Sequence, residues 1–131
     1  MKAMLIGGAG FVGKHLAIHL ANTYGWEIVI TGLPEEREAI ERSSLGRFIP
    51  VNILEKGQIQ AVLEQERPHY IFHLAAQSSV ARSWKNPQAT IDVNIKGCAN
   101  LLDAIHSVEI YDPKILLIGS GDEYGRLPDG I

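Results

Sequence analysis

The feature that most constrains the fold is a short apolar run that ends in a glycine-rich loop. Residues 3–6 read Ala-Met-Leu-Ile, and residues 7–13 read Gly-Gly-Ala-Gly-Phe-Val-Gly. A continuous apolar run of this length, stopped by glycine, is typical of a strand that is buried on both faces. From residue 13 to residue 24 the apolar positions recur at helical spacing, so the loop is expected to join a buried strand to a helix.

Three glycines of this loop, Gly7, Gly10 and Gly13, stand at intervals of three residues. In a strand–loop–helix unit the first glycine permits a tight turn, the second lets the backbone approach a pyrophosphate, and the third allows close packing of helix and strand. The pyrophosphate then lies at the helix N-terminus, where free N–H groups and the helix dipole favour negative charge. The alternative is a plain strand-to-helix turn. Because the loop lies at a junction of this kind, the sequence favours a dinucleotide site.

The hydrophobic period switches repeatedly along the rest of the chain. Further strands are predicted at residues 27–30, 48–51, 69–75 and 114–118, and the proline in the second of these indicates an edge position. Helices are predicted at residues 34–44, around residues 59–63, and at residues 87–106. This alternation predicts right-handed βαβ units and a parallel sheet. The expected fold is a single doubly wound α/β Rossmann domain over residues 1–131, with strand order 3-2-1-4-5 and incomplete at one edge.

Composition excludes several other classes of protein. The 131 residues are 46% hydrophobic and 21% charged with a net charge of −3, which is ordinary for a globular domain and gives no basic excess for nucleic acid. No apolar run approaches the ~18 residues that span a membrane. A single cysteine, Cys98, suits a reducing cytoplasm, and the five histidines lack metal-ligand spacing. We therefore expect a cytoplasmic domain without nucleic-acid, membrane or metal partners.

The end of the second strand bears on the choice between NAD and NADP. An acidic residue there favours NAD because it binds the ribose 2′-hydroxyl, whereas a nearby arginine favours NADP. The sequence at this point is Thr31-Gly32-Leu33, without a carboxylate, and Arg37 and Arg42 follow among several glutamates. The sequence inclines toward NADP, while pairing of both arginines with those glutamates leaves NAD open.

Four segments together resemble the extended short-chain dehydrogenases/reductases, the NAD-dependent epimerase/dehydratase family that acts on nucleotide sugars. They are the loop G-x-x-G-F-V-G, the stretch H-L-A-A-Q-S-S-V at residues 73–80, the stretch N-I-K-G-x-x-N-L-L-D-A at residues 94–104, and I-G-S-G-D-E-Y-G at residues 118–125. The resemblance covers essentially the whole chain. Within the family it is closest to GDP-4-dehydro-6-deoxy-mannose reductases and GDP-mannose 4,6-dehydratases.

The resemblance implies roles for the residues that match the family's motifs. The implied cofactor contacts are Gly7, Gly10, Phe11, Val12, Gly13, Asn52, Ile53, Leu74, Ala75, Ala76 and Gln77. Asn52 stands where the family has an aspartate near the adenine amino group, and its carbonyl oxygen accepts a hydrogen bond without a charge. Ser120 is implied to hydrogen-bond the sugar at the reacting carbon. Asp122 stands where dehydratases place a glutamate base, a difference that favours a reductase.

The family's Tyr-x-x-x-Lys pair is missing from this sequence. Residues 28, 74, 115 and 128, four positions beyond each tyrosine, are Ile, Leu, Ile and Pro. The resemblance therefore implies an N-terminal fragment that carries the NAD(P)-binding domain, with the Tyr–Lys helix and the substrate domain outside it. We expect the fragment alone to be inactive, because losing general acid–base catalysis costs typically about 10²–10⁴-fold.

For the full-length protein the resemblance implies hydride transfer at carbon 4 of a GDP-hexose. Alternatives are a nucleotide-sugar 4-epimerase of the same family and a non-catalytic dinucleotide-binding regulatory module. A homo-oligomer is also expected. On the helix at 87–106 one stripe comprises Ile91, Ile95, Cys98, Leu102 and Ile105, and a smaller side comprises Val93, Gly97, Leu101 and Ala104. The stripe cannot face both the sheet and a partner, so we expect this helix or the open strand edge to mediate self-association.

Overall fold

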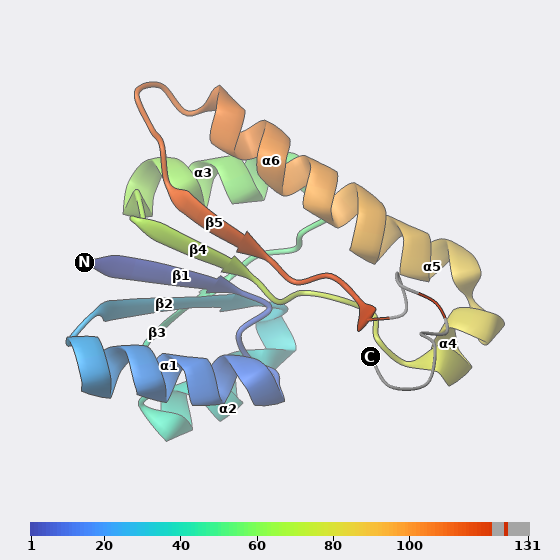
Figure 1. Ribbon diagram of the computed structural model, residues 1–131, viewed down its shortest axis with the longest axis horizontal. Coiled ribbons are helices and arrows are strands. Elements are labelled where there is room, and N and C mark those ends of the chain that lie inside the picture. Colours follow the sequence, from blue (N-terminus) through green and yellow to red (C-terminus); the bar gives the residue numbers. More distant parts are fainter. Residues whose placement is uncertain (122–124, 126–131) are drawn as a thin grey trace.

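The computed structural model describes residues 1–121 and 125, and its centre is a five-stranded parallel sheet (Figure 1). The strands are β1 (Lys2–Ile6), β2 (Glu27–Gly32), β3 (Arg47–Pro50), β4 (Tyr70–His73) and β5 (Lys114–Leu117). Their order across the sheet is β3-β2-β1-β4-β5. The predicted doubly wound Rossmann fold and its strand order are confirmed.

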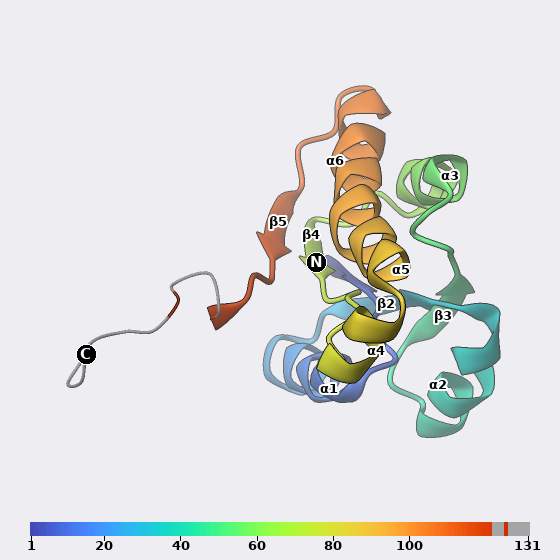
Figure 2. The ribbon, with the colours of Figure 1, turned by 90° about the vertical axis from the view of Figure 1, so that its right-hand side faces the viewer.

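Helices lie on both faces of the sheet, as the two views show (Figures 1 and 2), while all four residues of the edge strand β5 are exposed. On one face lie α1 (Phe11–Tyr24) and α2 (Arg37–Ser43), which follows a 3₁₀ turn, η1 (Pro34–Glu36). The other face carries α3 (Lys56–Glu66) and a long helical segment made of α5 (Pro87–Ile91), a π-helical turn η2 (Asp92–Lys96) and α6 (Gly97–Ser107). None of the helices in the described part of the chain is long and apolar enough to cross a membrane.

The alternation of side chains along each strand divides the core in two. Met4 and Ile6 of β1 pack toward α3 and α6, whereas Ala3 and Leu5 pack toward α1 and α2. Each of these four residues is at most 4% exposed. Both faces of the central strands are therefore buried, which is why their sequences are continuously apolar.

The structure contains one helix that the sequence did not reveal. Residues Val80–Lys85 form α4, a helix of six residues that begins where the Ser79 hydroxyl accepts a hydrogen bond from the Arg82 N–H at 3.4 Å. A segment this short spans less than two helical turns, too few for a period to show. Its N-cap serine was the available signal.

The long helix turns its smaller side, not its larger apolar stripe, toward the core. Leu101 and Ala104 are fully buried, while the stripe residues Ile91, Ile95 and Leu102 are 43–65% exposed. Gly97 makes this arrangement possible, because an added Cβ there would lie only 3.1 Å from the Ile53 side chain. Close approach of the backbone thus decides which side of the helix is buried, and the stripe is left on the surface.

A buried carboxylate joins three elements at the end of the sheet where β1 begins. The Glu66 side chain of α3 is 3% exposed and accepts hydrogen bonds from Arg47 Nη1 of β3 at 2.9 Å and from Lys2 Nζ of β1 at 3.1 Å. The hydrogen bonds from Arg47 lower the pKa of Glu66; burial opposes this effect, and Lys2 adds to the lowering. The charged form of Glu66 is therefore the form that the fold stabilises.

We expect Glu66→Gln to reduce the free energy of unfolding by about 2 kcal/mol at pH 7, because it weakens charge-assisted hydrogen bonds to a buried group. Since folding lowers the pKa of Glu66, its contribution is present above the ordinary glutamate pKa of about 4.3 and is lost as the pH falls below it. Urea unfolding between pH 7 and pH 3 measures both effects.

The matched control is Glu38→Gln, which removes an exposed ion pair with Arg42 on α2 and should cost no more than about 0.5 kcal/mol. A difference between Glu66→Gln and the unmodified chain that stays constant down to pH 3 would contradict the assigned role of Glu66.

Candidate functional site

A cavity of about 670 Å³ opens at the edge of the sheet where the strands end. Its walls come from the glycine loop, the end of β2, the segment after β3 and the segment after β4. The predicted cofactor residues that line it are Gly7, Gly10, Phe11, Val12, Gly13, Asn52, Ile53, Leu74, Ala75 and Ala76. Residues more than sixty positions apart in sequence thus meet in one cleft. Gln77 lines a neighbouring cavity instead.

The three glycines of the loop differ in what the structure requires of them. Gly7 has φ +75°, and an added Cβ would lie 2.5 Å from the Ala75 Cα, so both its conformation and its contact demand glycine. At Gly13 a Cβ would lie 2.3 Å from the Gly8 carbonyl oxygen. At Gly10 the nearest atom to a Cβ is the Gly7 carbonyl oxygen, 3.8 Å away. The fold itself therefore needs Gly7 and Gly13, while Gly10 leaves space that opens on the cavity.

Gly10 is also the residue from which α1 starts. It is exposed and extended, and its carbonyl oxygen accepts the first helical hydrogen bond, from the Lys14 N–H at 3.2 Å. The N–H groups of the first helical turn precede that bond and have no partner within the helix. The residues of this first turn, Phe11, Val12 and Gly13, line the cleft, and Phe11 and Val12 are exposed. This is the arrangement that binds phosphate groups at helix N-termini.

The tip of β2 carries a carboxylate after all, and the sequence prediction that it lacks one is wrong. Glu36 lines the cavity, its Oε2 accepts a hydrogen bond from the Leu33 N–H at 2.7 Å, and it lies 2.3 Å from the place of a Cβ on Gly32. The turn η1, which begins at Pro34, brings the chain back over the strand end. A glutamate three residues after Leu33, the residue that precedes the turn, was the available signal.

The two arginines that pointed toward NADP are engaged on α2 itself. Arg37 pairs with Glu41, with 3.1 Å between Nη1 and Oε1, and its guanidinium lies 5.6 Å from the centre of the Phe48 ring. Arg42 pairs with Glu38. Neither arginine lines the cavity. The alternative in which both arginines pair with neighbouring glutamates is therefore the one the structure shows.

Asn52 is held in a local turn at the far wall of the cavity. Its Oδ1 accepts a hydrogen bond from the Leu54 N–H at 3.0 Å, and its own N–H donates to Gln58 Oε1 at 2.9 Å. An amide oxygen has two lone pairs, so one acceptor position on Oδ1 remains beyond this internal bond. The side chain is oriented by the backbone that follows it.

A second cavity of about 620 Å³ adjoins the first, and Leu74, Ala75, Ala76 and Ser78 line both. The described lining contains no Asp, Glu, Lys or Arg. Apart from the imidazole of His73, its polar side chains are amides and hydroxyls: Gln77, Ser78, Ser79, Ser83, Thr90, Asn94 and Ser120. Cys98 is half-buried at this cavity. Ser120 lines this cavity, and Asp122 falls outside the described residues.

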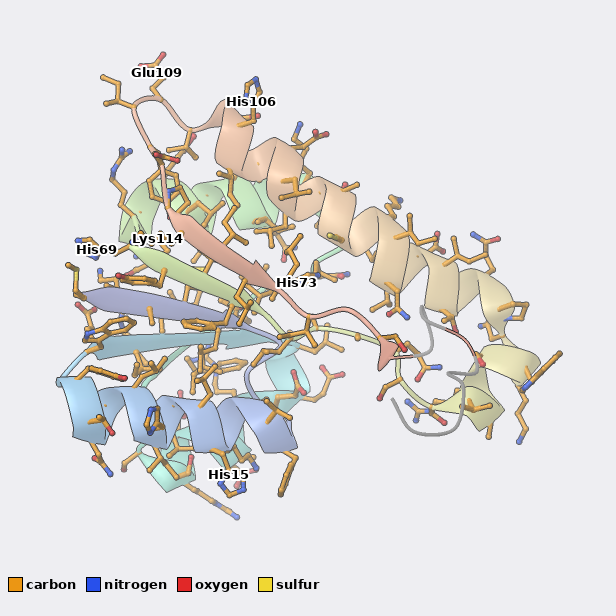
Figure 3. All side chains as sticks on the ribbon, viewed as in Figure 1. His15, His69, His73, His106, Glu109 and Lys114 are labelled. Carbon is orange, nitrogen blue, oxygen red and sulfur yellow. The ribbon has the colours of Figure 1, made fainter. Side chains whose placement is uncertain are left out.

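His73 lies at the floor of this second cavity. Figure 3 shows it toward the end where the strands terminate, with His69 and Lys114 at the opposite end of the sheet. The residue is 7% exposed, and its Nδ1 has no hydrogen-bond partner among the described residues. Burial lowers the pKa of His73, so the ring is neutral at pH 7.

A doubly wound parallel sheet with a glycine loop, a helix N-terminus and a cleft at the strand ends defines a dinucleotide-binding type of domain. Residues 3–131 match the NAD dependent epimerase/dehydratase family, and the chain belongs to it.

Three similar proteins illustrate the range of the family. GDP-6-deoxy-D-mannose reductase of Pseudomonas aeruginosa is 30% identical over 98% of this chain and 36% of its own length. dTDP-glucose 4,6-dehydratase of Salmonella typhimurium is 35% identical over 79% of this chain and 30% of its own length. The crystal structure of UDP-glucuronic acid 4-epimerase from Bacillus cereus, in complex with UDP-glucuronic acid and NAD, superposes with a TM-score of 0.79 at 27% identity. The superposition covers all of this chain and 44% of the epimerase chain. The chain thus spans about a third to two-fifths of these relatives.

We expect Gly10→Val to abolish binding of NAD while changing the free energy of unfolding by no more than about 1 kcal/mol. The isopropyl group fits beside the loop but occupies the space through which a pyrophosphate approaches the helix N-terminus. Calorimetric titration with NAD, together with urea unfolding, measures both quantities.

Gly57→Val is the matched control, because a Cβ at Gly57 meets nothing within 4 Å and this residue of α3 does not line the cleft. It should bind NAD as the unmodified chain does. Unchanged affinity in Gly10→Val would rule out the role assigned to Gly10.

Proposed function

We propose that this chain is the NAD-binding part of a nucleotide-sugar oxidoreductase. The dinucleotide lies across the first cavity, with the pyrophosphate over Gly10 at the start of α1. The adenine end lies against Asn52 and Ile53, and the nicotinamide end lies along Leu74–Gln77. The observation that carries this proposal is the open space at Gly10, which the fold does not need and which lies where an anion meets the helix N-terminus.

The second cavity supports a sugar as the substrate group. Its amide and hydroxyl side chains, without a charged residue in the described lining, suit a neutral ring with several hydroxyl groups. The cavity adjoins the nicotinamide end of the proposed cofactor site because Ala75, Ala76 and Ser78 belong to both. A sugar carbon held there lies next to the end of the dinucleotide that exchanges hydride.

Within this arrangement the chain's own residues bind and orient. Bound NAD supplies the hydride acceptor or donor. Ser120, at the second cavity, forms a hydrogen bond to the hydroxyl or carbonyl oxygen of the reacting carbon, and Asp122 is the proposed base in a dehydration. Neutral His73 below the cavity adds no charge to the site. The sequence holds no Tyr-x-x-x-Lys pair, so we assign no residue of this chain to proton exchange with that oxygen.

For the reaction of the full-length protein we propose hydride transfer at carbon 4 of a GDP-hexose, by a reductase or a 4,6-dehydratase. The similarity to a GDP-6-deoxy-D-mannose reductase along 98% of this chain supports the reductase. A 4-epimerase is the second candidate, because a UDP-glucuronic acid 4-epimerase superposes on the whole chain. The exposed stripe Ile91–Ile95–Leu102 on the long helix supports assembly into a homo-oligomer through that helix.

Glu36 favours NAD over NADP in this proposal. Its carboxylate lies at the tip of β2, where the adenine ribose of a dinucleotide lies in this fold. A carboxylate accepts a hydrogen bond from the ribose 2′-hydroxyl and repels a 2′-phosphate. The arginines that would neutralise such a phosphate are paired with Glu38 and Glu41. We therefore propose NAD as the preferred cofactor, against the inclination toward NADP that the sequence alone gave.

The proposed function is tested in two steps. The chain is titrated with NAD in a calorimeter, and saturation-transfer NMR spectra are then recorded for the loaded chain with GDP-mannose, UDP-glucose and dTDP-glucose. We expect NAD to bind with one site per chain and GDP-mannose to produce saturation-transfer signals on its hexose protons. Absence of NAD binding would overturn the proposal. Equal hexose signals from all three sugars would leave the NAD site standing and remove the preference for GDP.

Glu36→Gln should reduce the ratio of NAD to NADP affinity by about 10–100-fold, because it removes the charge that repels a 2′-phosphate. The amide oxygen still accepts the hydrogen bond from the Leu33 N–H, so the turn keeps its shape. Glu35→Gln is the control, since Glu35 carries the same charge on the same turn but does not line the cavity. Parallel titrations with NAD and NADP give the ratio, and an equal ratio in Glu36→Gln and Glu35→Gln would refute the assignment.

A further inference from the structure

Three small polar or glycine residues recur at intervals of three along the long helix: Asn94, Gly97 and Asn100. Asn94 lies in the π-helical turn η2, and the other two lie in α6. This spacing contributes to the family resemblance. Asn94 also lines the second cavity, but the function proposed above gives Gly97 and Asn100 no role. π-helical turns within α-helices are rare and occur frequently at functional sites.

Asn94 binds both backbone groups of a single residue in the segment after β4. The Gln77 N–H donates to Asn94 Oδ1 at 2.7 Å, and Asn94 Nδ2 donates to the Gln77 carbonyl oxygen at 3.1 Å. The side-chain amide thus pairs with the N–H and the carbonyl oxygen of one residue, much as a residue on a neighbouring antiparallel strand does. Gln77 in turn fixes the next residues, because its side chain accepts from the Ser79 N–H at 2.9 Å and donates to the Ser79 carbonyl oxygen at 3.0 Å.

Asn100 holds the segment after β3 in a similar way. Its Nδ2 donates to the carbonyl oxygens of Ile53 and Leu54, both at 3.1 Å. Between the two asparagines, Gly97 is buried against Ile53. A Cβ added to Gly97 would lie 3.1 Å from the Ile53 side chain. One helix therefore contacts two segments that lie more than twenty residues apart in sequence.

These two segments supply two walls of the first cavity. Asn52, Ile53 and Leu54 line it from one segment, and Leu74, Ala75 and Ala76 line it from the other. The second segment continues directly to Gln77, which lines the adjoining cavity. We propose that Asn94, Gly97 and Asn100 form a brace that sets the distance between the two walls, with Asn94 positioning the nicotinamide end and Asn100 the adenine end of the dinucleotide. All three are positioning residues. The inference rests on the function proposed above.

The physical reason is preorganisation. Both walls are loops, and loops lose conformational freedom when a ligand orders them. Hydrogen bonds from a helix that is already packed on the core fix the walls before the ligand arrives, so the loss is not incurred on binding. Because each asparagine holds one wall, removing one of them should weaken only the part of the ligand that contacts that wall.

The test compares AMP, which occupies only the adenine end, with NAD, which occupies both ends. Asn94→Ala should weaken NAD binding about tenfold and leave AMP binding unchanged, because one or two hydrogen bonds that order a single wall are lost. Asn100→Ala should weaken both ligands by the same factor. The matched control Lys96→Ala, at an exposed position between them on the same helix, should change neither.

Hydrogen exchange provides a readout that needs no ligand. In Asn94→Ala the Gln77 amide should exchange at least tenfold faster, whereas the Leu101 amide in α6 should keep its rate. Asn94→Asp keeps an acceptor for the Gln77 N–H and loses the donor to the Gln77 carbonyl oxygen, so it should show smaller changes in the same direction, and it serves if Asn94→Ala fails to fold.

The outcomes separate this inference from the proposed function. If the unmodified chain binds no NAD, the proposed function fails, and the exchange rate at Gln77 still decides whether Asn94 holds that wall. If NAD binds but both asparagine variants weaken AMP and NAD alike, or neither ligand is weakened, the brace is wrong and the NAD site stands. An unchanged exchange rate at Gln77 in Asn94→Ala would overturn the part of the inference that concerns Asn94.

Discussion

The structure depends on the close contact between the glycine loop and the segment that follows β4. No side chain separates Gly7 from Ala75: an added Cβ on Gly7 would lie 2.5 Å from the Ala75 Cα. The Gly7 N–H donates to the Thr31 carbonyl oxygen at 2.9 Å, and the Leu74 N–H donates to that of Ile6 at 2.8 Å. Backbone from the ends of β1, β2 and β4 is thus joined directly, and the cleft has a floor made of main chain.

The two ends of the sheet serve different purposes. At the end where the strands begin, the buried Glu66 accepts hydrogen bonds from Lys2 and Arg47 and joins β1, β3 and α3. At the end where the strands terminate, the walls of the cleft are loops fastened by uncharged amides, chiefly Asn94 and Asn100. Ionic contacts therefore stabilise the scaffold, and neutral hydrogen bonds shape the site. The carboxylate of Glu36 at the tip of β2 is the exception at the cleft, and it lies where a cofactor's ribose is expected.

Features that arise from local sequence were predictable, and features that arise from contact between distant segments were not. The strands and the glycine loop follow from hydrophobic period and spacing within a few residues. The strand order followed from the Rossmann class that this alternation indicates, and the segment at Ala75–Ala76 followed from the resemblance. The position of Glu36 depends on a turn that folds back over its strand, which period alone does not report. The buried side of the long helix was undecidable from sequence because both sides are apolar, and the contact of Gly97 with Ile53 decides it. Nothing in the sequence indicated that Asn52 Oδ1 accepts a hydrogen bond from the Leu54 N–H.

The central claim is that one dinucleotide lies across the cleft from Asn52 to Gln77, over the start of α1. A titration of the ¹⁵N-labelled chain with NAD, followed by amide chemical shifts, tests it most directly. The account predicts that the largest shifts fall together in three separate segments, residues 7–13, 52–54 and 74–77, with none at Trp26 and Tyr70, whose rings stack at 4.4 Å in another part of the fold. Shifts confined to the exposed stripe of the long helix, or shifts in only one of the three segments, would contradict it.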